Sequence, residues 1–255
     1  MEKMMDEARR FAKFESVPGI VRIFDCFEAN DTSYLILEYL EGMTLKSYLK
    51  ENGPMSAEQA IPIVLEIAAA MKKVHKAGIL HRDIALDNIQ ILNPGEKEAL
   101  RAKLFDFGAS RYATTKHRKS LSVIIKLGYA TEEQYRSRGD QGSWTDVYAL
   151  AATLYTMLTG AVPQDAMEQG VKDEIKRPSK MGVKLLKPVE TALMNALNVK
   201  IQDRTQTMEE FAGELMAAEV KERSITKMKK EVGRFPNGSL PSKERGLLWL
   251  RLLPF

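Results

Sequence analysis

The sequence is poor in cysteine and has no long apolar run. Its 255 residues include one cysteine, so an internal disulfide framework is excluded and a reducing compartment is favoured. No stretch approaches the roughly 18 apolar residues that a membrane-spanning helix needs. The first fourteen residues are charged throughout and lack the apolar segment of a secretory signal. We therefore expect a cytoplasmic chain without a membrane segment.

The charge is unevenly distributed along the chain. The net charge is +4, and residues 219–255 hold nine Lys and Arg against four Glu, so the excess of positive charge lies in this tail. A basic tail can contact nucleic acid or acidic lipid, but a solvated helix face explains the same pattern more simply. Nucleic-acid binding is therefore disfavoured. With 44% hydrophobic and 28% charged residues, the whole chain has the composition of a globular protein.

Periodicity and turn residues predict a short strand-bearing start followed by a mostly helical body. Strands are expected over residues 20–27 and 34–39, joined by a turn at Asn30-Asp31. Helices are expected over residues 2–15, 44–50, 56–77, 147–158 and 188–197, and from 207 onward. Residues 147–158 contain no charge, which predicts a helix that is buried on every side. The expected fold class is α+β with a dominant helical part.

Two segments contain the residue types that phosphoryl transfer requires. Residues 81–88 read His-Arg-Asp-Ile-Ala-Leu-Asp-Asn and place Asp83 five residues before Asn88 on a tight loop. Residues 103–108 read Lys-Leu-Phe-Asp-Phe-Gly, so Asp106 follows an apolar strand. A carboxylate can accept the proton of an attacking hydroxyl, while a second carboxylate and an amide oxygen can hold Mg²⁺ beside phosphate oxygens. Either segment alone is a weak signal, since an Asp before Phe-Gly can simply form a turn.

Together the two segments resemble the His-Arg-Asp loop and the Asp-Phe-Gly motif of protein kinases. The resemblance covers about residues 1–215 and is closest to the bacterial serine/threonine kinases of eukaryotic type. It implies a kinase-like fold with a partial N-lobe and hinge over residues 1–40 and a helical C-lobe over residues 41–218. The basic tail, residues 219–255, matches no part of the family pattern.

The resemblance also implies a role for individual residues. Asp83 would be the catalytic base, and Asn88 and Asp106 would hold Mg²⁺ or Mn²⁺. The nucleotide contacts expected for ATP are Glu7, Glu38, Leu40 and Gln90. The residues expected to organise the site are His81, Arg82, Phe107, Gly108, Glu132, Asp146 and Arg204. Among these, Asp146 would tie down the catalytic loop, and Arg204 would pair with Glu132.

Two main departures from the family pattern, and two milder ones, bear on activity. No Gly-rich loop or strand lysine precedes Glu7 in the printed sequence, so we expect the chain to be impaired when isolated. Ala85 stands where these kinases usually have lysine, and losing such a charged hydrogen bond costs roughly 1.5–3 kcal/mol. Leu86 and Thr131 replace prolines.

These departures leave two functions open. The first is an ATP-dependent protein serine/threonine kinase, with ATP and a protein substrate as partners. The alternative is a pseudokinase or interaction module that uses the C-lobe as a binding surface. A small-molecule phosphotransferase is disfavoured by the segment 128–135, which resembles a peptide-substrate platform. Candidate phosphorylation sites are Thr114, Thr115, Ser120 and Ser122; a merely polar loop explains them equally well.

Overall fold

The computed structural model describes residues 17–30, 32–96, 100–107, 126–136 and 139–217. The predicted helix over residues 2–15 and the basic tail lie outside these ranges. So do Glu7, Gly108 and the four candidate phosphorylation sites. The chain divides into two compact units, Met1–Leu215 and Met216–Phe255. The first unit contains almost all of the described residues.

The described part begins with an antiparallel hairpin. Strands β1 (Ile23–Ala29) and β2 (Thr32–Leu37) pair across a turn at Asn30, whose φ of 52° is one that asparagine tolerates. The hairpin prediction is confirmed, but β1 begins three residues later than expected. The reason is that the preceding residues belong to another sheet: Val21 N–H donates to Leu104 O at 2.9 Å, and Leu104 N–H donates to Gly19 O at 2.9 Å.

A second, three-stranded sheet supports the loops of the site. Its antiparallel order is β3 (Met43–Thr44), β4 (Ile89–Ile91) and β5 (Ala102–Leu104). Helix α2 (Leu45–Asn52) follows β3 directly, and the Thr44 hydroxyl caps it by accepting from Ser47 N–H. Gly53 ends the helix with a φ of 77°.

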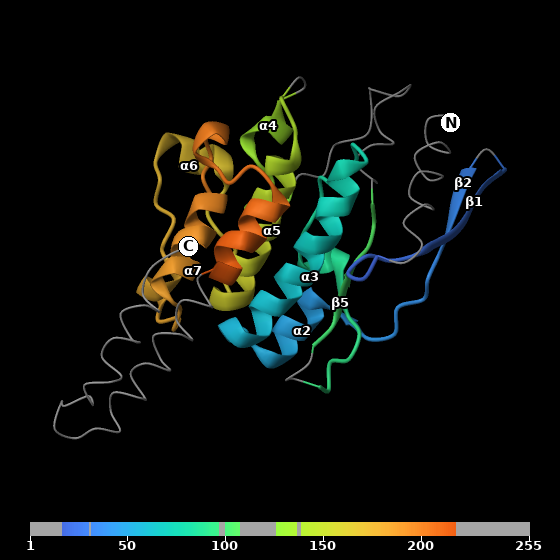
Figure 1. Ribbon diagram of the computed structural model, residues 1–255, viewed down its shortest axis with the longest axis horizontal. Helices are drawn as coiled ribbons and strands as arrows, with labels where there is room; N and C mark the ends of the chain where they lie inside the picture. The colour runs from blue at the N-terminus through green and yellow to red at the C-terminus, as the bar shows by residue number, and fades with distance from the viewer. Residues whose placement is uncertain (1–16, 31, 97–99, 108–125, 137–138, 218–255) are drawn as a thin grey trace, which may run out of the picture. The chain divides into compact units, whose positions relative to one another are not determined.

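The helical body packs around one buried helix, α5 (Ser143–Thr159), which contacts α3 (Ala57–Lys76) and α7 (Lys187–Ala196) (Figure 1). Every residue of α5 from Thr145 to Leu158 is buried, including the uncharged residues 147–158 whose burial the sequence predicts. Residues 208–217 are also helical. No helix among the described residues is long and apolar enough to cross a membrane.

Shorter elements connect the long helices. The two short α-helices are α4 (Glu132–Tyr135) and α6 (Ala166–Val171). Three single 3₁₀ turns complete the described part: η1 (Leu86–Asn88), η3 (Pro178–Met181) and η4 (Ile201–Asp203). None of the five was predicted, because helical periodicity needs about two turns to show itself.

Candidate active site

Asp146 holds the loop that contains Asp83. One carboxylate oxygen accepts from His81 N–H at 2.8 Å and contacts His75 Nε2 at 2.8 Å, and the other accepts from Arg82 N–H at 2.7 Å. Burial raises the pKa of Asp146, but the hydrogen bond to His75, the neighbouring histidines and the His81 N–H together hold it below the ordinary value. A carboxylate that is charged and fully buried can therefore fix this backbone, which is the contact the sequence predicts.

Two non-glycine residues of the site have left-handed backbone geometry. Arg82 has a φ of 68° and Asp106 a φ of 61°. Aspartate tolerates this region and arginine adopts it rarely, so contacts around Arg82 must hold it there. They are the bond from Arg82 N–H to Asp146 and a bond at 2.8 Å from Gln134 Nε2 to Arg82 O. The backbone of Arg82 in the loop 81–88 is thus held by two hydrogen bonds, one at its N–H and one at its carbonyl.

His81 joins the two motifs. Its ring is fully buried; Nε2 lies 3.1 Å from Phe105 O, and Nδ1 accepts from Asp83 N–H at 3.2 Å. A carbonyl at Nε2 and an N–H at Nδ1 require the neutral ring with its proton on Nε2. Burial lowers the pKa of His81 and outweighs the nearby carboxylates. The Phe107 ring packs edge-on against it with centroids 4.5 Å apart.

Asn88 is oriented by Asp83. Its Nδ2 donates to Asp83 O at 2.7 Å and to the Asp83 carboxylate at 2.8 Å. Both bonds need a donor, so they identify the amide nitrogen and leave Oδ1 on the opposite side as an acceptor. Asn88 is 6% exposed. Asn88 thus holds Asp83 through Nδ2, and its Oδ1 can serve as an oxygen ligand.

Asp106 is brought beside Asn88 by the pairing of β4 with β5. Ile89 is paired with Leu104, and Phe105 N–H donates to Asn88 O at 2.9 Å. Asn88 and Asp106 therefore leave the same end of the ladder, although 18 residues separate them. No cluster of three His, Cys, Asp or Glu side chains that could hold a metal occurs among the described residues. One amide and one carboxylate oxygen do fit Mg²⁺ that is also bound by phosphate oxygens.

The linker between β2 and β3 contains Glu38 and Leu40, and side chains of the second sheet hold it. The Glu38 carboxylate accepts from Lys103 Nζ at 2.5 Å and from Arg22 N–H at 3.1 Å. Burial raises the pKa of Glu38, but these two donors lower it overall. Gln90 Nε2 donates to Leu40 O at 3.1 Å. Glu38 and Gln90 therefore anchor the linker with their side chains, and the adenine contacts assigned to this region remain a prediction.

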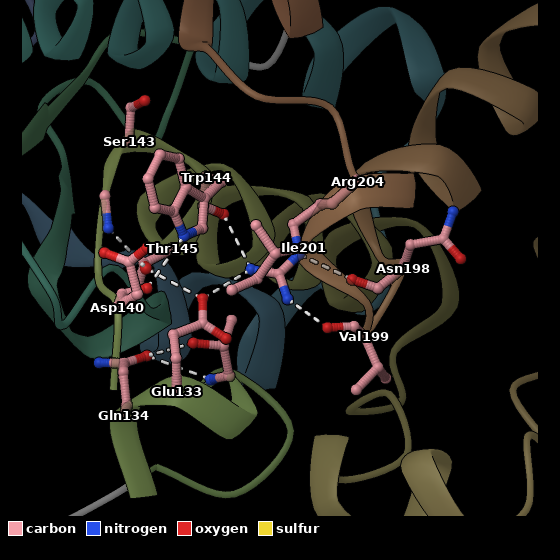
Figure 2. Close-up of polar contacts among 12 residues, drawn as sticks. Glu133, Gln134, Asp140, Ser143, Trp144, Thr145, Asn198, Val199, Ile201 and Arg204 are labelled. Carbon is pink, nitrogen blue, oxygen red and sulfur yellow. Dashed lines mark hydrogen bonds and ion pairs between the residues drawn. The ribbon is translucent and has the colours of Figure 1, made fainter. Parts of the chain in front are cut away.

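The ion pair expected between Glu132 and Arg204 is wrong by one residue. Figure 2 shows that Arg204 meets Glu133: Nη1 donates to Glu133 Oε1 at 2.8 Å, and Thr145 Oγ1 donates to the same oxygen at 3.0 Å. The two charged side chains are 0% and 5% exposed. Arg204 also donates to three backbone carbonyls, those of Asn198, Val199 and Trp144. Glu132 instead pairs with Arg136 at the surface.

Helix geometry explains the shift from Glu132 to Glu133. Thr131 and Gln134 form a capping box that starts α4 at Glu132. Successive helical residues point about 100° apart, so when one glutamate faces solvent its neighbour can face the core. The sequence does signal where α4 starts, because Thr131 and Gln134 have the capping-box spacing. The spacing does not tell which of the two glutamates faces Arg204.

One residue beside the base was not predicted at all. Lys126 Nζ lies 3.0 Å from the Asp83 carboxylate and 2.8 Å from Asp87 Oδ1. Burial lowers the pKa of Lys126, but its hydrogen bonds to Asp87 and Asp83 raise it overall, so the side chain is charged. Nothing in the spacing of the sequence connects Lys126 to a loop 43 residues earlier.

Comparison with known proteins identifies the family of this chain. The protein kinase domain family matches residues 1–231. The serine/threonine-protein kinase PrkC of Bacillus subtilis is 38% identical over 149 residues, which is 58% of this chain and 22% of that protein. The serine/threonine-protein kinase PknB of Mycobacterium leprae is 31% identical over 212 residues, 78% of this chain and 33% of that protein. The chain thus spans at most about a third of the length of these relatives.

The solved structures agree on the fold. A crystal structure of Rad53 residues 1–466 in complex with AMP-PNP matches 84% of this chain and 55% of that chain, with a TM-score of 0.68 and 22% identity. The Rad53 kinase domain with SCD2 matches 83% of this chain and 76% of that chain, with a TM-score of 0.62. At this identity the likeness concerns the fold alone, and it confirms the predicted α+β kinase-like class.

Proposed function

The chain belongs to the protein kinase family, and we propose that it is a catalytic domain that transfers the γ-phosphoryl group of ATP to serine or threonine hydroxyls of proteins. The observation that supports this most is the arrangement of Asp83, Asn88 and Asp106. The amide of Asn88 holds the Asp83 carboxylate at 2.8 Å, and the β4–β5 ladder brings Asp106 next to Asn88. The proposed base and the two proposed metal ligands then belong to one end of one small sheet.

Each of the three residues has one task in this reaction. The Asp83 carboxylate accepts the hydroxyl proton as the substrate oxygen forms its bond to phosphorus and the bond from phosphorus to the ADP oxygen breaks. Asn88 fixes the carboxylate so that it need not reorganise during the step. Asn88 Oδ1 and the Asp106 carboxylate would hold Mg²⁺, which neutralises phosphate charge when it is bound.

The contacts of residues 128–135 support a protein substrate. Gly128 N–H donates to Asp165 Oδ2 at 3.3 Å, and Tyr135 Oη donates to the same oxygen at 2.6 Å. Gln134 ties this segment to Arg82 O in the catalytic loop. A backbone fixed in this way beside the base can receive an extended peptide.

The test is phosphoryl transfer from γ-labelled ATP to a mixed serine and threonine peptide pool, with Asp83→Asn as the variant. The variant is expected to lose about 10²- to 10⁴-fold in kcat, because it lacks the proton acceptor, while nucleotide affinity stays unchanged. Asp140→Asn is the matched control, because Asp140 is exposed. Its backbone oxygen accepts a hydrogen bond from Trp144 Nε1, which the substitution does not change. Equal rates for Asp83→Asn and the unmodified chain would contradict the proposal.

A second candidate, an interaction module, is favoured by the apolar surface of the hairpin. Phe24, Phe27, Tyr34 and Ile36 are each more than 40% exposed, and the Phe27 and Tyr34 rings stack 5.2 Å apart. Exposed apolar clusters of this kind often bind other proteins. An unmodified chain that binds nucleotide without any phosphoryl transfer would favour this candidate.

A further inference from the structure

The loop that contains Asp83 has alanine instead of lysine at position 85, and a distant segment brings a lysine to the same loop. Ala85 is only 2% exposed and has no charge to offer. Lys126 reaches the loop from outside: its Nζ lies 3.0 Å from Asp83 and 2.8 Å from Asp87. The side chains of Lys126 and Asp83 are 24% and 27% exposed, so water only partly screens this pair.

The backbone of Lys126 is held independently of the catalytic loop. Its carbonyl accepts from Tyr129 N–H and Ala130 N–H, both at 3.0 Å. Tyr129 Oη donates to Thr156 on α5 at 3.2 Å. Gly128 has a φ of 79°, and a Cβ there would lie 2.6 Å from Pro163 O, so only glycine fits this turn. The ammonium group is thus presented to Asp83 by a platform built on the buried helix.

Charge balance gives Lys126 a reason to be there. Asp83 and Asp87 lie on one loop, Asp106 lies at the end of the adjoining ladder, and the proposed reaction adds the negative charge of ATP. Like charges at such short range oppose binding and deprotonation of the substrate hydroxyl. One ammonium group shared between Asp83 and Asp87 reduces this repulsion beside the attacking oxygen.

We propose that Lys126 is a positioning residue for the Asp83 base and supplies the cation that position 85 lacks. This inference rests on the phosphoryl-transfer function proposed above. Lys126 Nζ donates to the Asp83 carboxylate at 3.0 Å, and Asn88 Nδ2 donates to it at 2.8 Å. Because the cation comes from the platform, the base is complete only when residues 126–135 are docked on α5.

The first test removes the charge of Lys126 and keeps the approximate length of its side chain. Lys126→Met is expected to lower kcat about 10- to 150-fold, the value of a charged hydrogen bond, with little change in KM for ATP. Lys126→Arg keeps the charge and is expected to recover most of that loss. Lys72→Met is the matched control, because Lys72 pairs with Glu209 at the surface.

Two outcomes would overturn the inference in an active chain. The first is a kcat of Lys126→Met that lies within about twofold of the kcat of the unmodified chain. Such a change is too small for the loss of a charged hydrogen bond. The other is an equal loss for Lys126→Met and Lys126→Arg together with a lower thermal midpoint, which would show a merely structural role. No transfer by the unmodified chain would instead contradict the proposed function.

A second measurement tests the contact without needing activity. Acetylation of individual lysines at one pH, followed by peptide mass spectrometry, reports which ammonium groups are protected. Lys126 is expected to react several-fold more slowly than exposed lysines, and Asp83→Asn and Asp87→Asn are each expected to speed its reaction. Equal reaction rates in the unmodified chain and both variants would overturn the inference even if no kinase activity were found.

Discussion

At the scale of single residues, His81 shows how burial and two hydrogen bonds select one protonation state. Phe105 O at Nε2 and Asp83 N–H at Nδ1 leave no place for a second proton, and burial lowers the pKa of the ring. The chain contains only three histidines, so their imidazole signals can be assigned one by one. The base-bearing loop therefore depends on a ring that must remain neutral.

We predict that nitrogen NMR finds His81 as the neutral tautomer with its proton on Nε2 from pH 8 down to about pH 6.5, the ordinary pKa of histidine. The unfolded chain protonates this ring near pH 6.5, about the ordinary value, while the folded chain does not. The unfolded state then binds more protons, so the free energy of unfolding must fall as the pH drops through this window. Titration of His81 at or above pH 6.5 would contradict the prediction.

At the scale of elements, two adjacent glutamates of α4 test how the helix is docked. Glu133→Gln leaves the buried Arg204 without its partner and is expected to reduce the free energy of unfolding by about 3–5 kcal/mol. Glu132→Gln breaks only a surface pair with Arg136 and is expected to cost no more than about 1 kcal/mol. Denaturant unfolding of both variants measures the difference. A larger loss of unfolding free energy for Glu132→Gln than for Glu133→Gln would contradict this prediction and favour the pair of Glu132 with Arg204.

At the scale of the whole molecule, nucleotide binding should stabilise the folded chain. Magnesium and ATP at a hundred times the dissociation constant would add about 2.7 kcal/mol. For a chain of this size that is a rise of about 5–10 °C in the thermal midpoint. Asp106→Asn is expected to abolish the magnesium-dependent part, and Asp140→Asn to retain it. A magnesium-dependent shift that survives in Asp106→Asn would exclude this carboxylate as the ligand.

Local patterns in the sequence determined much of the fold. The hairpin turn at Asn30, the capping box that starts α3, the buried uncharged stretch 147–158 of α5 and the capping contact between Thr207 and Glu210 follow from neighbouring residues alone, and the structure contains all of them. The motif residues Asp83, Asn88 and Asp106 could be proposed from the sequence because their order and spacing are short-range features, and their roles remain predictions. Four-residue and six-residue helices were missed because they contain too few turns for a period.

Tertiary structure decided which groups meet across long stretches of chain. The sequence by itself established a kinase-like α+β chain and indicated Asp83 as a candidate base and Asn88 and Asp106 as candidate oxygen ligands. It did not establish that Glu133 rather than Glu132 faces Arg204, since that depends on the rotation of a short helix against α5. Nor did it indicate that Lys126 contacts Asp83. A charge missing at one position can be provided through space by any segment docked nearby, and only folding brings residues 83 and 126 within 3.0 Å.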